Sequence, residues 1–147
     1  MQSDDPGCTS GQAARFRSYA LDEWRKFIDS KNIPADEHVI MTGDFNIKKD
    51  TTEFNALLTR LDARQPNKYD GHLWSWDTRS NEIAHYNYPD SLPEYIDYVL
   101  IDKKHKAAKS VVQTVLKVNS PQYELKSVPH HEYSDHYPVR ALVEVDL

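Results

Sequence analysis

The chain has 147 residues, of which 39% are hydrophobic and 28% are charged, and it carries a net charge of −5. A domain of this length can bury a hydrophobic core, because roughly 68–70% of its unfolded surface becomes inaccessible on folding. The acidic balance argues against a non-specific nucleic-acid binder, which presents a basic face to phosphates. No run reaches the roughly 20 apolar residues of a transmembrane helix, and residues 1–5 have neither the basic nor the apolar region of a signal peptide.

Residues 1–11 are polar and contain the helix breakers Pro6, Gly7 and Gly11, so we expect a loop there. This loop carries Cys8, the single cysteine, which has no partner for a disulfide within the chain. Two interpretations of Cys8 are open: a reduced or incidental thiol, or a cysteine whose partner lies outside this chain.

Apolar residues at helical spacing predict an amphipathic helix over residues 12–31. A break then precedes a short apolar run at residues 38–42, which predicts a buried strand. A capping box follows, in which Asp50 accepts hydrogen bonds from the first-turn amides and Glu53 reaches back. The apolar stripe after this box predicts a helix over residues 51–61. The apolar positions of the first helix are Phe16, Ala20, Trp24, Phe27 and Ile28.

The second half of the chain has the patterns of loops and strands. Residues 62–94 are rich in Asp, Asn, Pro and aromatic residues and show little periodicity, which is typical of functional loops. Strands are predicted at residues 95–101 and 110–118, and alternating branched residues predict a half-buried strand at residues 139–145. Helices and strands alternate early and strands dominate late, so the fold class is α/β or a mixed sandwich.

The motif Gly43-Asp44-Phe45-Asn46 follows the first predicted strand. In an extended backbone, the side chains of Asp44 and Asn46 project to the same side. Their oxygens are hard ligands suited to magnesium or calcium, and the amide of Asn46 can donate to a phosphate oxygen. A turn without a ligand is the alternative, since Gly-Asp-x-Asn is also ordinary turn chemistry.

Three further polar residues lie in or next to predicted strands. Asp135 and His136 precede the last strand, so the carboxylate can reach a metal or water while the imidazole acts as a general base. Asp97 lies within the apolar run at residues 96–100, where a carboxylate is costly unless it is paired. We expect Asp97 to fix the tautomer and orientation of the His136 ring. Structural roles for the Asp-His pair, and a surface position for Asp97, are the alternatives.

The order of these motifs, Gly-Asp-x-Asn, then Asp97-Tyr98, then Ser134-Asp135-His136, resembles the endonuclease/exonuclease/phosphatase superfamily of DNase-I-like metallophosphoesterases. The sequence between the motifs resembles the bacterial secreted neutral sphingomyelinases of the sphingomyelinase C and beta-hemolysin type. The segments that carry this second resemblance are residues 31–34, 74–77, 81–89 and 102–106.

The resemblance implies one domain over residues 1–147 that is the C-terminal half of a DNase-I-like four-layer α/β sandwich. It implies hydrolysis of sphingomyelin in membranes to ceramide and phosphocholine, with Mg2+ or another divalent cation as cofactor and no nucleic-acid partner. It also implies a secreted protein. The residues that match the family's catalytic positions are His136, Asp44, Asn46 and Asp97, and those that match its metal site are Asp44, Asn46, Asp135 and His136.

Family members are about twice this length, so the resemblance implies that an upstream half is missing. That half supplies an Asn and a Glu for the metal and a His near the leaving group, and its cysteine pairs with the position of Cys8. We therefore expect the isolated chain to be inactive and to expose an apolar sheet face. The hairpin at residues 121–129 is shorter than the membrane-inserting hairpin of some members, so we expect a simple connection there.

Four aromatic residues fall between the motifs and have two interpretations. Trp74, Trp76, Tyr86 and Tyr88 could line a choline pocket, because aromatic faces attract quaternary ammonium groups. They could equally be core residues. Two other functions also stay open at this stage: a DNase-like or apurinic-site nuclease of the same superfamily, and a truncated homologue that binds lipid without turnover.

Overall fold

The computed structural model describes residues 1–4, 7, 9 and 11–146. The elements follow in the order α1 (Gln12–Asp29), β1 (Ile40–Asp44), α2 (Thr52–Arg60), β2 (Ala63–Arg64), β3 (Lys68–Gly71), α3 (Glu82–Asn87), β4 (Asp97–Asp102), β5 (Ser110–Val115), β6 (Tyr123–Leu125), β7 (Val128–His130) and β8 (Val139–Glu144). None of the described helices combines the length and apolar character that crossing a lipid bilayer requires.

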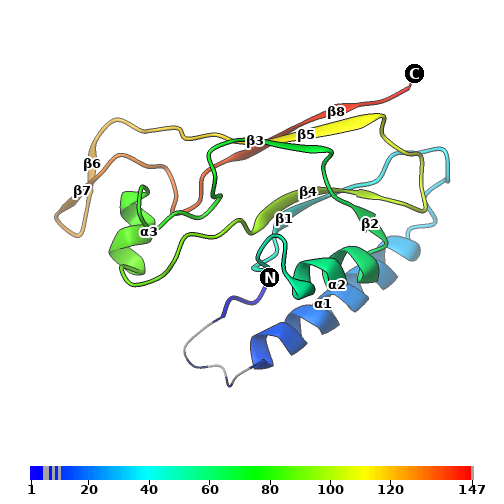
Figure 1. The fold of residues 1–147 in the computed structure, drawn as a ribbon, viewed down its shortest axis with the longest axis horizontal. Coiled ribbons are helices and arrows are strands. Elements are labelled where there is room, and N and C mark those ends of the chain that lie inside the picture. Colours follow the sequence, from blue (N-terminus) through cyan, green and yellow to red (C-terminus); the bar gives the residue numbers. More distant parts are fainter. Residues whose placement is uncertain (5–6, 8, 10, 147) are drawn as a thin grey trace.

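These elements form three layers (Figure 1). One sheet has the strand order β3-β5-β8, the next has the order β1-β4-β2, and α1 and α2 cover the second sheet. The short α3 and the β6–β7 hairpin lie together at one end of the molecule (Figure 1). The α/β fold class predicted from the sequence is therefore confirmed, with one helical layer and both sheet layers of the expected sandwich.

Strand register places the functional motifs at one end of the second sheet. β1 runs antiparallel to β4, with Ile40 opposite Ile101 at one end and Asp44 opposite Asp97 at the other. In the first sheet β5 is parallel to β3 and antiparallel to β8. β8 begins three residues after His136, so this histidine enters the same end of the sandwich.

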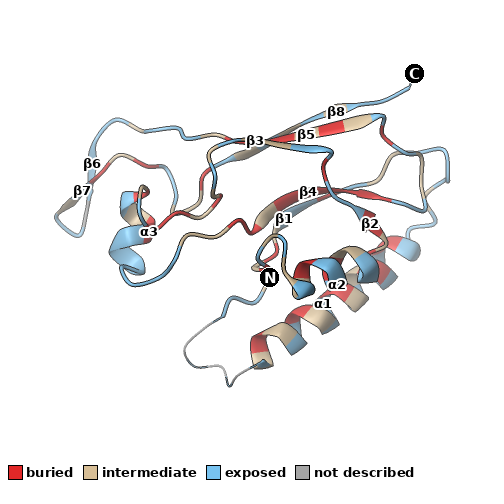
Figure 2. Ribbon diagram, viewed as in Figure 1, coloured by how far each residue is buried: buried red, intermediate tan, exposed pale blue. Residues whose placement is uncertain are grey.

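The main core lies between the second sheet and the two long helices (Figure 2). Tyr98 and Leu100 of β4 contribute to it, and Phe45 and Phe54 pack against the Tyr98 ring at centroid distances of 5.8 and 4.8 Å. Ile101, also on β4, joins a smaller cluster with residues of the other sheet. β4 is therefore buried on both faces, which explains its continuous apolar sequence.

Helix α1 lies where the sequence predicts it, but its buried side differs from the predicted apolar stripe. Phe16 and Phe27 are 50% and 56% exposed, whereas Arg17 and Arg25 are buried. Both arginines can be buried because each forms an ion pair with a carboxylate. Arg17 pairs with Glu53 at 2.7 Å, and Arg25 pairs with the fully buried Asp102. Tertiary ion pairs thus set the orientation of this helix.

The predicted capping box of the second helix is wrong in both of its members. Thr51 is the N-cap of α2, and its hydroxyl accepts a hydrogen bond from the amide of Phe54 at 3.2 Å. Asp50 instead adopts a left-handed backbone conformation with φ 62°. Glu53 does not reach back, because its carboxylate binds Arg17.

Several predicted boundaries also change. β1 begins two residues later than predicted and extends into the Gly-Asp motif, and it is largely exposed because it is an edge strand among the described residues. The region predicted as loops, residues 62–94, contains β2, β3 and α3. β5 ends at Val115, and the segment predicted as a hairpin contains the antiparallel strands β6 and β7.

We predict that Arg25→Ala lowers the free energy of unfolding by about 3–5 kcal/mol, because it leaves the Asp102 carboxylate buried without its cation. A urea titration measures this change. Arg60→Ala is the matched control, since Arg60 pairs with Asp22 on the surface and such pairs contribute about 0–1 kcal/mol. Equal effects of the two substitutions would contradict the importance of the buried pair.

Stability should also fall in acid through the same carboxylate. Burial alone would raise the pKa of Asp102, but hydrogen bonds from Arg25 and His105 outweigh it and hold the pKa below its ordinary value. A lowered folded-state pKa stabilises the fold above the unfolded-state value, near 3.9, and this stabilisation is lost as the pH falls through the folded-state value. The difference in unfolding free energy between wild type and Asp102→Asn should therefore be full at pH 7 and shrink below about pH 4.

Candidate active site

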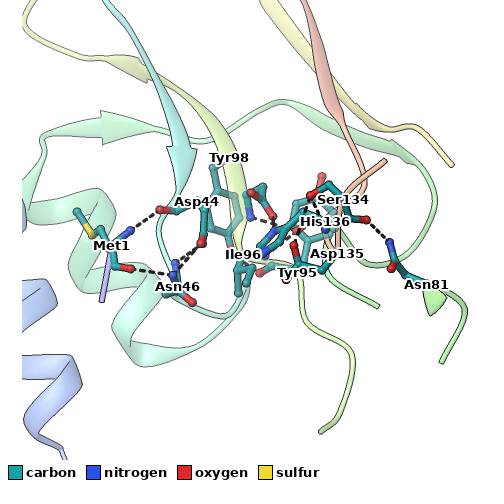
Figure 3. A network of polar contacts seen from close by, with 12 residues as sticks. Met1, Asp44, Asn46, Asn81, Tyr95, Ile96, Tyr98, Ser134, Asp135 and His136 are labelled. Atoms are coloured by element: carbon teal, nitrogen blue, oxygen red, sulfur yellow. Dashed lines mark hydrogen bonds and ion pairs between the residues drawn. The ribbon is translucent and has the colours of Figure 1, made fainter. Parts of the chain in front are cut away.

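A cleft of about 510 Å³ opens at the end of the sandwich where β1, β4 and the start of β8 meet. Its lining includes Asp44 at the end of β1, Asp97 at the start of β4 and His136 just before β8. Three residues from distant parts of the sequence are therefore brought to one cavity. Figure 3 shows the polar contacts at this place.

Asp97 and His136 form a hydrogen-bonded pair. The Nδ1 atom of His136 lies 2.9 Å from the Oδ2 atom of Asp97, and both side chains are partly buried. Because an ionised carboxylate only accepts, this contact assigns a proton to Nδ1 and leaves Nε2 to act as a base. Burial alone would lower the pKa of His136, but the hydrogen bond and charge of Asp97, with Asp44 and Asp135, raise it.

Asp44 and Asn46 form a compact turn beside this pair (Figure 3). The backbone amide of Asn46 donates to Oδ1 of Asp44 and its side-chain amide donates to Oδ2, both at 2.7 Å. Asn46 reaches this position through a left-handed conformation with φ 50°, which asparagine tolerates better than most residues. The two side chains thus lie together, although through this turn and not through the extended backbone from which the spacing predicts a shared side.

Two carboxylates face each other across the strand pair. Asp44 and Asp97 are directly opposite in the antiparallel register, where β-carbons lie about 4.5–5.5 Å apart. Burial and then repulsion from Asp97 raise the pKa of Asp44, although the hydrogen bond from the Asn46 amide opposes this rise. Like charges in this arrangement are unfavourable unless a proton or a cation lies between them.

Asp135 stands next to the imidazole and is only partly exposed, and its charge contributes to the raised pKa of His136. A hydrogen bond fixes the segment that carries Asp135, since the side-chain amide of Asn81 donates to the carbonyl of Ser134 at 2.8 Å. Among the described residues, no three His, Cys, Asp or Glu side chains converge to hold an ion by themselves. Asp44, Asn46 and Asp135 are therefore a partial ligand set at most.

The four aromatic residues predicted for a choline pocket are not gathered in one place. Trp76 contacts Tyr88 with ring centroids 5.5 Å apart, whereas Tyr86 packs on His130 at 5.7 Å. Trp74 packs against the main core. None of the four lines the cleft that contains His136.

Cys8 lies outside the described residues.

Gln113 of β5 is a residue of the site that the sequence motifs do not predict, although its position in the strand is informative. It is fully buried, its Oε1 atom accepts from the amide of Val99, and its Nε2 atom donates to the carbonyl of Asp97 at 2.9 Å. A glutamine at an inward position between Val111 and Val115 was the available signal, because a buried amide needs partners. Gln113 links the two sheets directly behind Asp97.

The chain is similar to known proteins in sequence and in fold. The profile of the Endonuclease/Exonuclease/phosphatase family matches residues 13–136. The chain belongs to this family. A phospholipase C of Staphylococcus aureus is 38% identical over 144 residues, covering 95% of this chain and 43% of the relative. A sphingomyelinase C of Bacillus cereus is 37% identical over 155 residues, covering 99% of this chain and 46% of the relative.

Two solved structures of this family share the fold. Sphingomyelinase C from Streptomyces griseocarneus has a TM-score of 0.89 at 34% identity, and the match covers 97% of this chain and 50% of that one. Beta toxin from Staphylococcus aureus with bound magnesium ions has a TM-score of 0.89 at 37% identity, covering 95% and 49%. The chain therefore spans about half the length of the sphingomyelinases it resembles.

Proposed function

We propose that this chain is the C-terminal half of a magnesium-dependent phosphodiesterase that hydrolyses sphingomyelin in membranes to ceramide and phosphocholine. The observation that carries the proposal is the Asp97–His136 pair, which shares a cleft with Asp44 in a chain 37% identical to a sphingomyelinase C. Residues 1–147 then form a partial domain, and secretion follows as part of the same proposal.

In this mechanism His136 is the general base. Its Nδ1 atom is bonded to Asp97, so Nε2 accepts the proton of the attacking water. Asp97 is a positioning residue that selects this tautomer and stabilises the imidazolium once it forms. General base catalysis of this kind contributes typically 10²–10⁴-fold to a rate.

The donor set beside His136 fits a magnesium ion. Asp44 and Asn46 offer hard oxygen atoms, and Asp44 lies directly opposite Asp97, where a cation would offset the repulsion between the two carboxylates. A bound Mg2+ would neutralise charge on the phosphoryl oxygens and lower the pKa of water. Asp44 and Asn46 would hold it, with Asp135 supporting the ligand shell.

The isolated chain lacks part of this machinery. Its described residues present no three-carboxylate or histidine cluster for a metal, and the chain spans about half the length of its relatives. β1 and β8 border the cleft and are edge strands among the described residues, with Ile40 and Leu142 46% and 70% exposed. We therefore propose that an upstream half pairs with these edges, completes the metal site and forms a disulfide with Cys8.

We predict that magnesium raises the melting temperature of the chain when it is combined with the upstream half of a homologous sphingomyelinase, and that Asp44→Ala abolishes this shift. An ion present at 100 times its dissociation constant stabilises the folded state by about 2.7 kcal/mol. Thermal unfolding with MgCl2 and with EDTA measures the effect. Asp146→Ala is the control, because Asp146 is a carboxylate near the C-terminus that pairs with Lys109. Equal shifts in all three proteins would remove Asp44 from the metal site.

Activity is tested by phosphocholine release from sphingomyelin vesicles, with labelled DNA as the competing substrate. We expect no release from the chain alone, and magnesium-dependent release when it is combined with the upstream half of a homologous sphingomyelinase. His136→Ala should then lower the rate by about 10²–10⁴-fold without unfolding the chain.

Two results would contradict the proposal. Cleavage of DNA in preference to sphingomyelin would make the protein a nuclease of the same family. Vesicle binding that persists with EDTA and in His136→Ala, without phosphocholine release, would indicate a lipid-binding homologue.

A further inference from the structure

Ser75 is fully buried between the strand that carries Asp97 and the segment that carries His136. Its hydroxyl oxygen accepts two hydrogen bonds, from the amide of Ile96 at 3.0 Å and from the amide of Asp97 at 3.1 Å. Its carbonyl oxygen accepts a third, from the amide of Tyr137 at 2.7 Å. One residue therefore contacts the backbone of Asp97 and the backbone next to His136.

Within the described part of the chain, the amide of Asp97 has no hydrogen-bond partner other than this serine. The neighbouring ladder bond runs from the Phe45 amide to the Ile96 carbonyl at 3.0 Å, so in an antiparallel pair the amide of Asp97 points away from β1. On that other side β2 pairs only with the far end of β4, at Ile101 and Asp102. The Ser75 hydroxyl occupies the place that a neighbouring strand would otherwise fill.

The segment around Ser75 is itself tied to both sides of the site. Trp76 exchanges two backbone hydrogen bonds with Glu94, at 3.0 and 2.8 Å, and it forms an isolated β-bridge with His136. Ser75 and Trp76 thus act as a two-residue strand inserted between the entry to β4 and the entry to β8. A shift of this segment would move both members of the Asp97–His136 pair.

We propose that Ser75 is a positioning residue that sets the distance and orientation between Asp97 and His136. Serine suits the position because one small oxygen atom has two lone pairs for two amides. Alanine would leave the buried amide of Ile96 and the amide of Asp97 without acceptors. The inference rests on the proposed function only in taking the Asp97–His136 pair as the catalytic base.

The test compares wild type with Ser75→Ala and Ser75→Cys by NMR of this chain, without substrate. The first readout is the downfield Nδ1 proton resonance of His136, assigned by its disappearance in Asp97→Asn. The second is the hydrogen exchange of the Ile96 and Asp97 amides. We expect the resonance to be lost in Ser75→Ala, with exchange of both amides at least about tenfold faster, since a lost acceptor of about 1.4 kcal/mol corresponds to tenfold.

Thr78→Val is the matched control, because Thr78 is a buried hydroxyl of the same segment that donates to the carbonyl of Ser91 at 2.6 Å. It should keep the His136 resonance and the slow exchange of both amides. Ser75→Cys keeps the approximate size but is a weak acceptor, so it should behave like Ser75→Ala even if the alanine variant does not fold.

The proposal is overturned if folded Ser75→Ala or Ser75→Cys retains the resonance and the slow exchange. It is also overturned if the wild-type Asp97 amide exchanges as fast as an unprotected loop amide. These results do not depend on phosphocholine release. A failure of the proposed function, seen as absent release from the combined halves, is therefore distinguishable from a failure of the role of Ser75.

Discussion

The antiparallel register of β1 and β4 is the constraint on which the rest of this site depends. It places Asp44 directly opposite Asp97 at the end of a sheet whose central strand is buried on both faces. Because two carboxylates in this position repel each other, the surroundings must supply positive charge or a proton. His136 supplies part of it through its hydrogen bond to Asp97, and the proposed cation supplies the rest.

The carboxylates at the two ends of β4 have different surroundings. Asp102 lies in the strand at one end, and Asp44 lies opposite Asp97 at the other end. At the far end Asp102 is neutralised by Arg25 and hydrogen-bonded by His105, so its pKa is lowered and the arrangement stabilises the fold. At the near end the pKa of Asp44 is raised, because the charges of His136 and of the Met1 amino group do not outweigh its burial and the repulsion from Asp97. A saturated ion pair suits a structural position, whereas unsaturated negative charge beside a cleft suits a binding site.

The edges of the two sheets connect the architecture to the proposed incompleteness. β1 and β8 are edge strands among the described residues, and both border the cleft. An upstream half that paired with these edges would extend both sheets and approach Asp44 and His136 together. Fold completion and completion of the metal site would then be one event, because the same strands carry both.

The sequence by itself determined the family, the α/β class and the functional motifs, because short apolar runs and the residues after them are local signals. It also suggested the Asp97–His136 pair, since a carboxylate in an apolar run needs a partner. Only the tertiary structure decided which side of α1 is buried, that Thr51 caps α2, and that Trp76 and Tyr88 contact each other while Tyr86 packs on His130 and Trp74 packs against the core. It alone revealed the partners of Gln113 and Ser75, because their side chains bind backbone amides 14 to 22 residues away in the sequence and no local pattern records such long-range hydrogen bonds.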